Sequence, residues 1–113
     1  MSRRRFDQAM HRMRENDLRV REDAFDFLRE HADAYVDELI AEFEAERDDH
    51  DLRCWLLELI AEARSPKALE LFRGQLRSVD DSLRFWAVRG LEMLGDRNAD
   101  QALDEARGDG WIA

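Results

Sequence analysis

The stretch DSLRFWAVRGLEML, residues 81–94, decides the fold of this chain. Its apolar residues recur at the spacing of one face of an α-helix: Leu83, Ala87, Leu91 and Leu94. Arg84 nevertheless stands in the first turn of this predicted helix, and Arg53 has the same place in HDLRCWLLELIAEA, residues 50–63. An arginine at the start of two otherwise apolar helices indicates a repeated structural role.

Three arginines mark an internal repeat of about 31 residues. Arg21, Arg53 and Arg84 are separated by 32 and 31 positions, and an apolar residue precedes each of them. Apolar residues also follow each arginine at the third and seventh positions, on one helical face. An aspartate stands four positions before every arginine: Asp17, Asp49 and Asp80. The chain therefore predicts three copies of one helical unit.

Each predicted helix is followed by a break and then by a second amphipathic helix. The breaks are Ala32-Asp33, Ser65-Pro66 and Gly95-Asp96. Serine and aspartate are residue types that cap helix N-termini, and a glycine suits the end of the preceding helix. The core positions of the second helices are Val36, Leu39, Ile40 and Phe43, then Ala68, Leu71, Phe72 and Leu76, then Ala99, Ala102, Leu103 and Ala106. A short apolar stripe before the first unit predicts one more helix: Phe6, Met10 and Met13.

This pattern resembles HEAT-like repeats of the bacterial type first described in phycobilisome lyases. The third unit, SLRFWAVRGLEMLGDRNADQAL, is the most similar, with the family's apolar-Arg, Ala, Leu, Leu-Gly-Asp, Ala and Leu in order. The second unit has Ala63-Arg64-Ser65 in place of Leu-Gly-Asp, and the first has His31-Ala32-Asp33 there. The resemblance covers about residues 17–107 and implies an architecture rather than an activity, because one fold carries many functions.

The resemblance implies an all-α fold, a short right-handed α-solenoid of about three HEAT-like helix pairs with an N-terminal capping helix. We expect a single domain over residues 1–113. Its parts are a capping helix at 1–15, unit one at 16–48, unit two at 49–79, unit three at 80–107 and a C-terminal tail at 108–113.

The resemblance also implies a role for the repeated arginines. In the family, the arginine near the start of each first helix tends to bond an aspartate of the adjoining turn. Here that pattern predicts an arginine–aspartate ladder, formed by Arg21, Arg53 and Arg84 with Asp17, Asp49 and Asp80. The alternative is that each aspartate only caps its helix, while each arginine extends to water.

The composition also favours an all-α protein, because the chain has no alternating β-branched run. No apolar stretch approaches the roughly 18 residues of a membrane span, and residues 1–10 lack the apolar core of a secretory signal. The single Cys54 cannot form an internal disulfide, which fits a reducing compartment. We therefore expect a cytoplasmic protein without membrane contact, in which Cys54 is a half-buried structural residue.

The net charge of −9 is unevenly distributed along the chain. Residues 1–21 carry +4, residues 22–51 carry −11 and residues 52–113 carry −2. Such an acidic middle argues against binding of nucleic acid, whose phosphates need cationic partners. It favours solubility or a protein partner with a basic surface.

No arrangement of residues in the sequence indicates catalysis, a cofactor or a metal ion. The histidines His11, His31 and His50 lie far apart, without the spacing of a zinc site. The chain has no glycine-rich phosphate loop, no GxSxG motif and no convincing Ser-His-Asp set. For the tryptophans we predict packing roles. Trp55 and Trp86 are expected to pack between adjacent units, and Trp111 over the open end of the last unit.

The outward faces of the second helices form the predicted partner-binding surface, a short concave groove with acidic ends and a basic middle. Its residues are Asp37, Glu38 and Glu42, then Glu70, Arg73 and Arg77, then Asp100, Asp104 and Glu105. The alternative is an ordinary solvated face. A second candidate surface is the basic N-terminal helix around Arg3, Arg4 and Arg5.

The predicted function is a small non-catalytic protein–protein interaction scaffold. A narrower hypothesis is an acidic immunity-type inhibitor of a basic partner, for which electrostatic steering is a sound physical basis. The alternative function is an enzyme or enzyme subunit of the HEAT-like lyase type.

Overall fold

The computed structural model describes the backbone of residues 2–113 and the side chains from residue 4 onward. Met1 and the side chain of Arg3, a residue of the predicted basic N-terminal surface, lie outside this described part. The α-helices are α1 (Ser2–Met13), α2 (Leu18–Glu30), α3 (Val36–Ala45), α4 (His50–Ala63), α5 (Leu69–Gln75), α6 (Asp81–Leu94) and α7 (Arg97–Gly108). Two 3-10 turns, η1 (Ala32–Ala34) and η2 (Pro66–Ala68), precede α3 and α5. Residues 2–113 contain no strand, so the predicted all-α class is confirmed.

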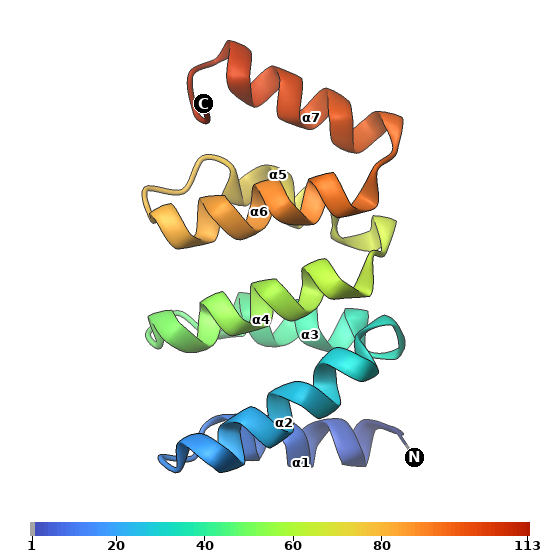
Figure 1. The fold of residues 1–113 in the computed structure, drawn as a ribbon, viewed down its shortest axis with the longest axis vertical. Coiled ribbons are helices and arrows are strands. Elements are labelled where there is room, and N and C mark those ends of the chain that lie inside the picture. Colours follow the sequence, from blue (N-terminus) through green and yellow to red (C-terminus); the bar gives the residue numbers. More distant parts are fainter. Residues whose placement is uncertain (1) are drawn as a thin grey trace.

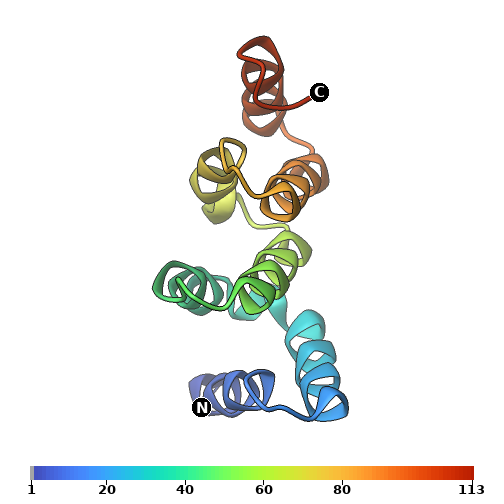
Figure 2. The ribbon, with the colours of Figure 1, turned by 90° about the vertical axis from the view of Figure 1, so that its left-hand side faces the viewer.

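The seven α-helices of residues 2–113 are stacked in layers along the longest axis of the molecule (Figure 1). The layers are α1 with α2, α3 with α4, and α5 with α6, and α7 closes the end of the stack. Seen from the side, α2, α4 and α6 form one row and α1, α3 and α5 the other, while α7 lies above both (Figure 2). No helix of this described part combines the length and the apolar character that crossing a bilayer requires.

The repeated aspartates begin the helices of the first row. Asp17, Asp49 and Asp80 are the N-caps of α2, α4 and α6, and each carboxylate accepts a hydrogen bond from a backbone N–H of the first turn. These bonds satisfy N–H groups that have no partner inside the helix. The 32- and 31-residue spacing of the sequence is therefore the spacing of helix starts.

The predicted breaks fall where helices end, and two of the three predicted caps are confirmed. Ser65 accepts from the N–H of Lys67, and Asp96 accepts from the N–H of Ala99. Gly95 ends α6 with φ of +63°, the left-handed conformation that glycine adopts without strain. The cap predicted for Asp33 is wrong, because Asp33 lies inside η1 and α3 begins after Tyr35 without a side-chain cap.

The predicted apolar faces form one continuous core. Every core position predicted for the second helices is buried or half-buried, as is the apolar stripe of α1. Leu28, Ile60 and Leu91, at the repeated seventh position after each arginine, are completely inaccessible to solvent. Trp55 packs between layers as predicted, because its ring meets Phe25 of α2 edge-on at 5.5 Å between centroids.

The predicted arginine–aspartate ladder is wrong. The Arg21 guanidinium lies over the Trp55 ring at 4.8 Å, and the Arg53 guanidinium lies over the Phe43 ring at 4.2 Å. Arg84 does form polar contacts of the predicted type, because it donates to the Ser78 carbonyl at 2.7 Å and pairs with a carboxylate. That carboxylate, however, belongs to Asp81 and not to a capping aspartate. The capping aspartates bond helix N–H groups, and the guanidinium groups of Arg21 and Arg53 pack on aromatic rings of neighbouring helices instead.

Candidate functional site

Eight of the nine predicted partner-binding residues lie on α3, α5 and α7, Arg77 lies just after α5, and each is exposed or half-buried. α3 and α5 belong to the same row, whereas α7 closes the stack (Figure 2). Predicted residues of α5 and α7 line one cavity, to which α3 contributes no residue, so the predicted surface has two parts. We call them the α5–α7 groove and the α3 acidic face, the latter formed by Asp37, Glu38 and Glu42.

The α5–α7 groove is an open cavity of about 810 Å³. It brings together four of the predicted residues, Glu70, Arg73, Arg77 and Glu105, and its walls also include Gly74, Leu76, Ala102, Ala106, Gly108, Asp109 and Trp111. The remaining predicted residues of α7, Asp100 and Asp104, are exposed but do not line it.

The charges of the groove are partly paired within the molecule. Arg73 bridges Glu105 of α7 at 2.9 Å and Glu70 of its own helix at 3.5 Å. Arg77 lies over the ring of Trp111 at 5.8 Å from its centroid. Trp111 thus lies between α5 and α7 and remains 46% exposed, rather than covering the open end of the last unit as predicted. The groove presents a tryptophan, two arginines and two glutamates on one open surface.

Two residues of the α3 acidic face form ion pairs with cationic side chains of neighbouring layers. Asp37 pairs with Lys67 of η2 at 3.1 Å, and Glu42 pairs with Arg14, which follows α1, at 2.9 Å. Arg14 also reaches Glu46 at 3.1 Å. These pairs connect successive layers and reduce the negative charge that α3 offers to solvent.

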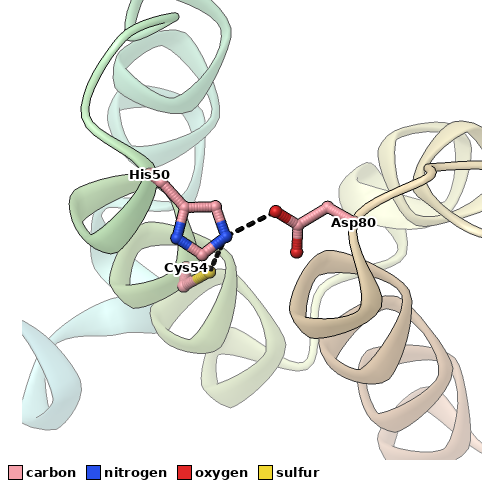
Figure 3. Close-up of side chains that lie close together, drawn as sticks. All are labelled: His50, Cys54 and Asp80. Carbon is pink, nitrogen blue, oxygen red and sulfur yellow. Dashed lines mark hydrogen bonds and ion pairs between the residues drawn. The ribbon is translucent and has the colours of Figure 1, made fainter.

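A second cluster of chemically active side chains lies where α4 and α6 begin (Figure 3). His50 is the first residue of α4, Cys54 lies one turn further along the same face, and Asp80 is the N-cap of α6. His50 Nε2 lies 3.7 Å from Cys54 Sγ and forms an ion pair with Asp80 Oδ2. One donor atom from each residue falls within 4.8 Å of the others.

The surroundings lower the pKa of Asp80 and raise the pKa of Cys54, the two acidic groups of this cluster. The N–H of Leu83 lowers the pKa of Asp80, and His50 lowers it further by its charge and its hydrogen bond. Burial raises the pKa of the Cys54 thiol, and the negative charges of Asp80 and Asp51 raise it further. At neutral pH the cluster therefore combines a carboxylate with a protonated thiol.

This geometry does not suit nucleophilic catalysis. A thiol–imidazole–carboxylate relay places the thiol at one ring nitrogen and the carboxylate at the other. Here Cys54 and Asp80 both approach Nε2, while Nδ1 faces Asp51 at 3.4 Å. A reactive cysteine also needs a lowered thiol pKa, whereas that of Cys54 is raised. The three donor atoms instead lie close enough together that they could hold one metal ion.

The sequence alone did not indicate this cluster. The three histidines have no zinc-site spacing among themselves, and the only local signal is the helical spacing of four between His50 and Cys54. Asp80 lies 26 positions after Cys54, and only the packing of α6 against α4 places it there. No family model, curated protein or solved structure matches this chain.

Proposed function

We propose that this chain is a small non-catalytic protein–protein interaction scaffold that binds its partner at the α5–α7 groove. The observation that carries the proposal is the groove itself, an open surface between two helices with Trp111, Arg73 and Arg77 along it. Tryptophan and arginine are enriched among the residues that contribute most to protein interfaces. The layered helices support the finer architecture we propose, a short right-handed α-solenoid of HEAT-like pairs.

The partner we propose is a protein with a basic surface. The support for this charge is the −11 balance of residues 22–51, which includes the α3 acidic face. Glu38 of that face forms no ion pair with the side chains of residues 4–113, and Glu70 and Glu105 add carboxylates at the groove. The narrower hypothesis, an acidic immunity-type inhibitor of a basic partner, has the same electrostatic support.

The test begins with affinity capture of the partner from native lysate on the wild-type protein. The captured protein is then purified, and its dissociation constant is measured by surface plasmon resonance. Trp111→Ala and Arg77→Glu should each weaken binding about tenfold or more, because each removes a large contact from the proposed interface.

Two variants outside the groove are the matched controls. Phe85→Ala removes another exposed aromatic residue, and Arg89→Glu reverses another exposed arginine, both on α6. Both should bind within about twofold of wild type. If the groove variants and the α6 variants bind equally well, the groove is not the partner site.

A further inference from the structure

We propose that His50, Cys54 and Asp80, which converge where α4 and α6 begin, form a site for a transition-metal ion of the zinc class. The ion would bridge two successive layers of the stack, since His50 and Cys54 belong to α4 and Asp80 to the start of α6 (Figure 3). The site is separate from the α5–α7 groove, because the two share no residue. It was not expected from the sequence, where Asp80 is remote.

The donor set selects the class of metal. Imidazole nitrogen and thiolate sulfur are preferred by zinc and its neighbours, whereas magnesium and calcium prefer oxygen ligands. In a tetrahedral zinc site, bonds of about 2.0–2.3 Å place nitrogen and sulfur ligands about 3.5 Å apart. The 3.7 Å between His50 Nε2 and Cys54 Sγ is close to this separation. Three protein ligands leave the fourth position open to water or to a group of another molecule.

The second nitrogen of the histidine has its own partner. Asp51 Oδ1 lies 3.4 Å from His50 Nδ1. A carboxylate in this place accepts the Nδ1 proton and so leaves Nε2 unprotonated to bind a metal. Binding of the ion needs an unprotonated Nε2 and releases the thiol proton of Cys54 to solvent. The ion also replaces the direct contact between His50 and Asp80.

The local charges favour a cation overall. Both helices begin here, and their partial positive charge opposes a metal ion. Three carboxylates lie at these helix starts and oppose that charge: Asp49 and Asp51 at α4, and Asp80 at α6. The nearest arginines are directed elsewhere, because Arg53 stacks on Phe43 and Arg84 binds Ser78 and Asp81. The side chain of His50 is 53% exposed, so the site is open to ions from solvent.

Cys54 is the single cysteine of the chain, so its reactivity reports on this site alone. The first experiment measures modification of wild-type Cys54 by a thiol reagent, with and without one equivalent of zinc. Zinc should slow the modification at least tenfold, EDTA should restore the original rate, and magnesium should have no effect. An unchanged rate in the presence of zinc would refute the proposal.

The second experiment identifies the ligands with cobalt(II) as the probe. Wild-type protein should show the absorption of a thiolate–cobalt bond, and Cys54→Ala should lose it. His50→Ala and Asp80→Asn should each weaken cobalt binding about tenfold or more. Asparagine retains an oxygen that can cap α6, so Asp80→Asn should remain folded, which circular dichroism verifies.

His11→Ala is the matched control for a histidine on the surface. His11 is 81% exposed on α1, far along the chain from the cluster, and its replacement should leave cobalt affinity unchanged. Equal losses in His11→Ala and His50→Ala would mean that the ion binds surface histidines without a built site. That result, or a thiolate band that survives in Cys54→Ala, overturns the proposal.

Discussion

At the scale of single residues, two half-buried arginines make unusual contacts. Arg21 and Arg53 lie over aromatic rings, and the Nε atom of each is buried without a hydrogen-bond partner. A buried donor without a partner destabilises a fold, whereas stacking of a guanidinium on a ring stabilises it. Neither arginine forms an ion pair with a capping aspartate. Their contribution to stability should therefore come mainly from packing.

Substitution of Arg53 separates packing from ion pairing. Arg53→Met retains a long side chain over Phe43 and removes the unpartnered Nε, so its free energy of unfolding should stay within about 1 kcal/mol of wild type. Arg53→Ala loses the stack and should destabilise by about 1–2 kcal/mol. Urea denaturation measures both values. Arg89→Ala, at a position with 55% exposure, is the control and should change stability by less than about 0.5 kcal/mol.

If Arg53→Met is as destabilising as Arg53→Ala, the polar contacts of the guanidinium matter more than its stack. That outcome would favour an arginine–aspartate contact of Arg53 in solution over its stack on Phe43.

At the scale of helices, α5 and α6 approach closely at one glycine. A Cβ atom at Gly90 of α6 would lie 2.4–2.7 Å from three ring atoms of Phe72 in α5. The Phe72 ring is 1% exposed and is enclosed by the core, so it has little room to move. Gly90 therefore sets how near the two helices of this layer can lie.

Two glycine-to-alanine substitutions should have opposite effects. Gly90→Ala should destabilise by about 1–3 kcal/mol, because overpacking against Phe72 exceeds the gain in helix propensity. Gly74→Ala in α5 should stabilise by about 0.5–1 kcal/mol, because nothing lies within 4 Å of its new Cβ atom. Urea denaturation of the two variants is the measurement. A gain in stability for Gly90→Ala would show that α5 and α6 can separate without cost.

At the scale of the whole molecule, ion pairs connect the layers and also neutralise part of the acidic charge. Arg14 links the end of α1 to Glu42 and Glu46, and Arg73 links α5 to Glu105 of α7. Reversing the charge of a paired acid would place like charges together. Neutral amides are therefore the appropriate probes of long-range attraction to a partner.

Neutralising the α3 acidic face should slow association with a basic partner. The triple variant Asp37→Asn, Glu38→Gln and Glu42→Gln should lower the on-rate several-fold at about 50 mM salt and much less at about 300 mM. Surface plasmon resonance with the captured partner measures both rates. The control has the same charge change on α2, made by amide substitutions at Glu22, Asp23 and Asp26, all exposed. Equal slowing by the two triple variants would indicate that only net charge matters.

The sequence by itself determined the local features of this protein. The helical periodicity, the breaks at Ser65-Pro66 and Gly95-Asp96, and the buried apolar faces were predictable. Each depends on hydrogen bonds within a few residues or on the regular spacing of apolar side chains. The cap predicted at Asp33 failed because η1 intervenes and moves the start of α3 beyond it.

Only the tertiary structure decided which side chains meet between helices. An arginine in the first turn of a helix can pair with an acid, reach solvent or stack on a ring, and the neighbouring helix selects among these. Packing of α4 against α3 directed Arg53 to Phe43, and packing of α6 against α4 placed Asp80 beside His50 and Cys54. These contacts depend on helix orientation and on distances between layers, which a periodic sequence pattern does not specify.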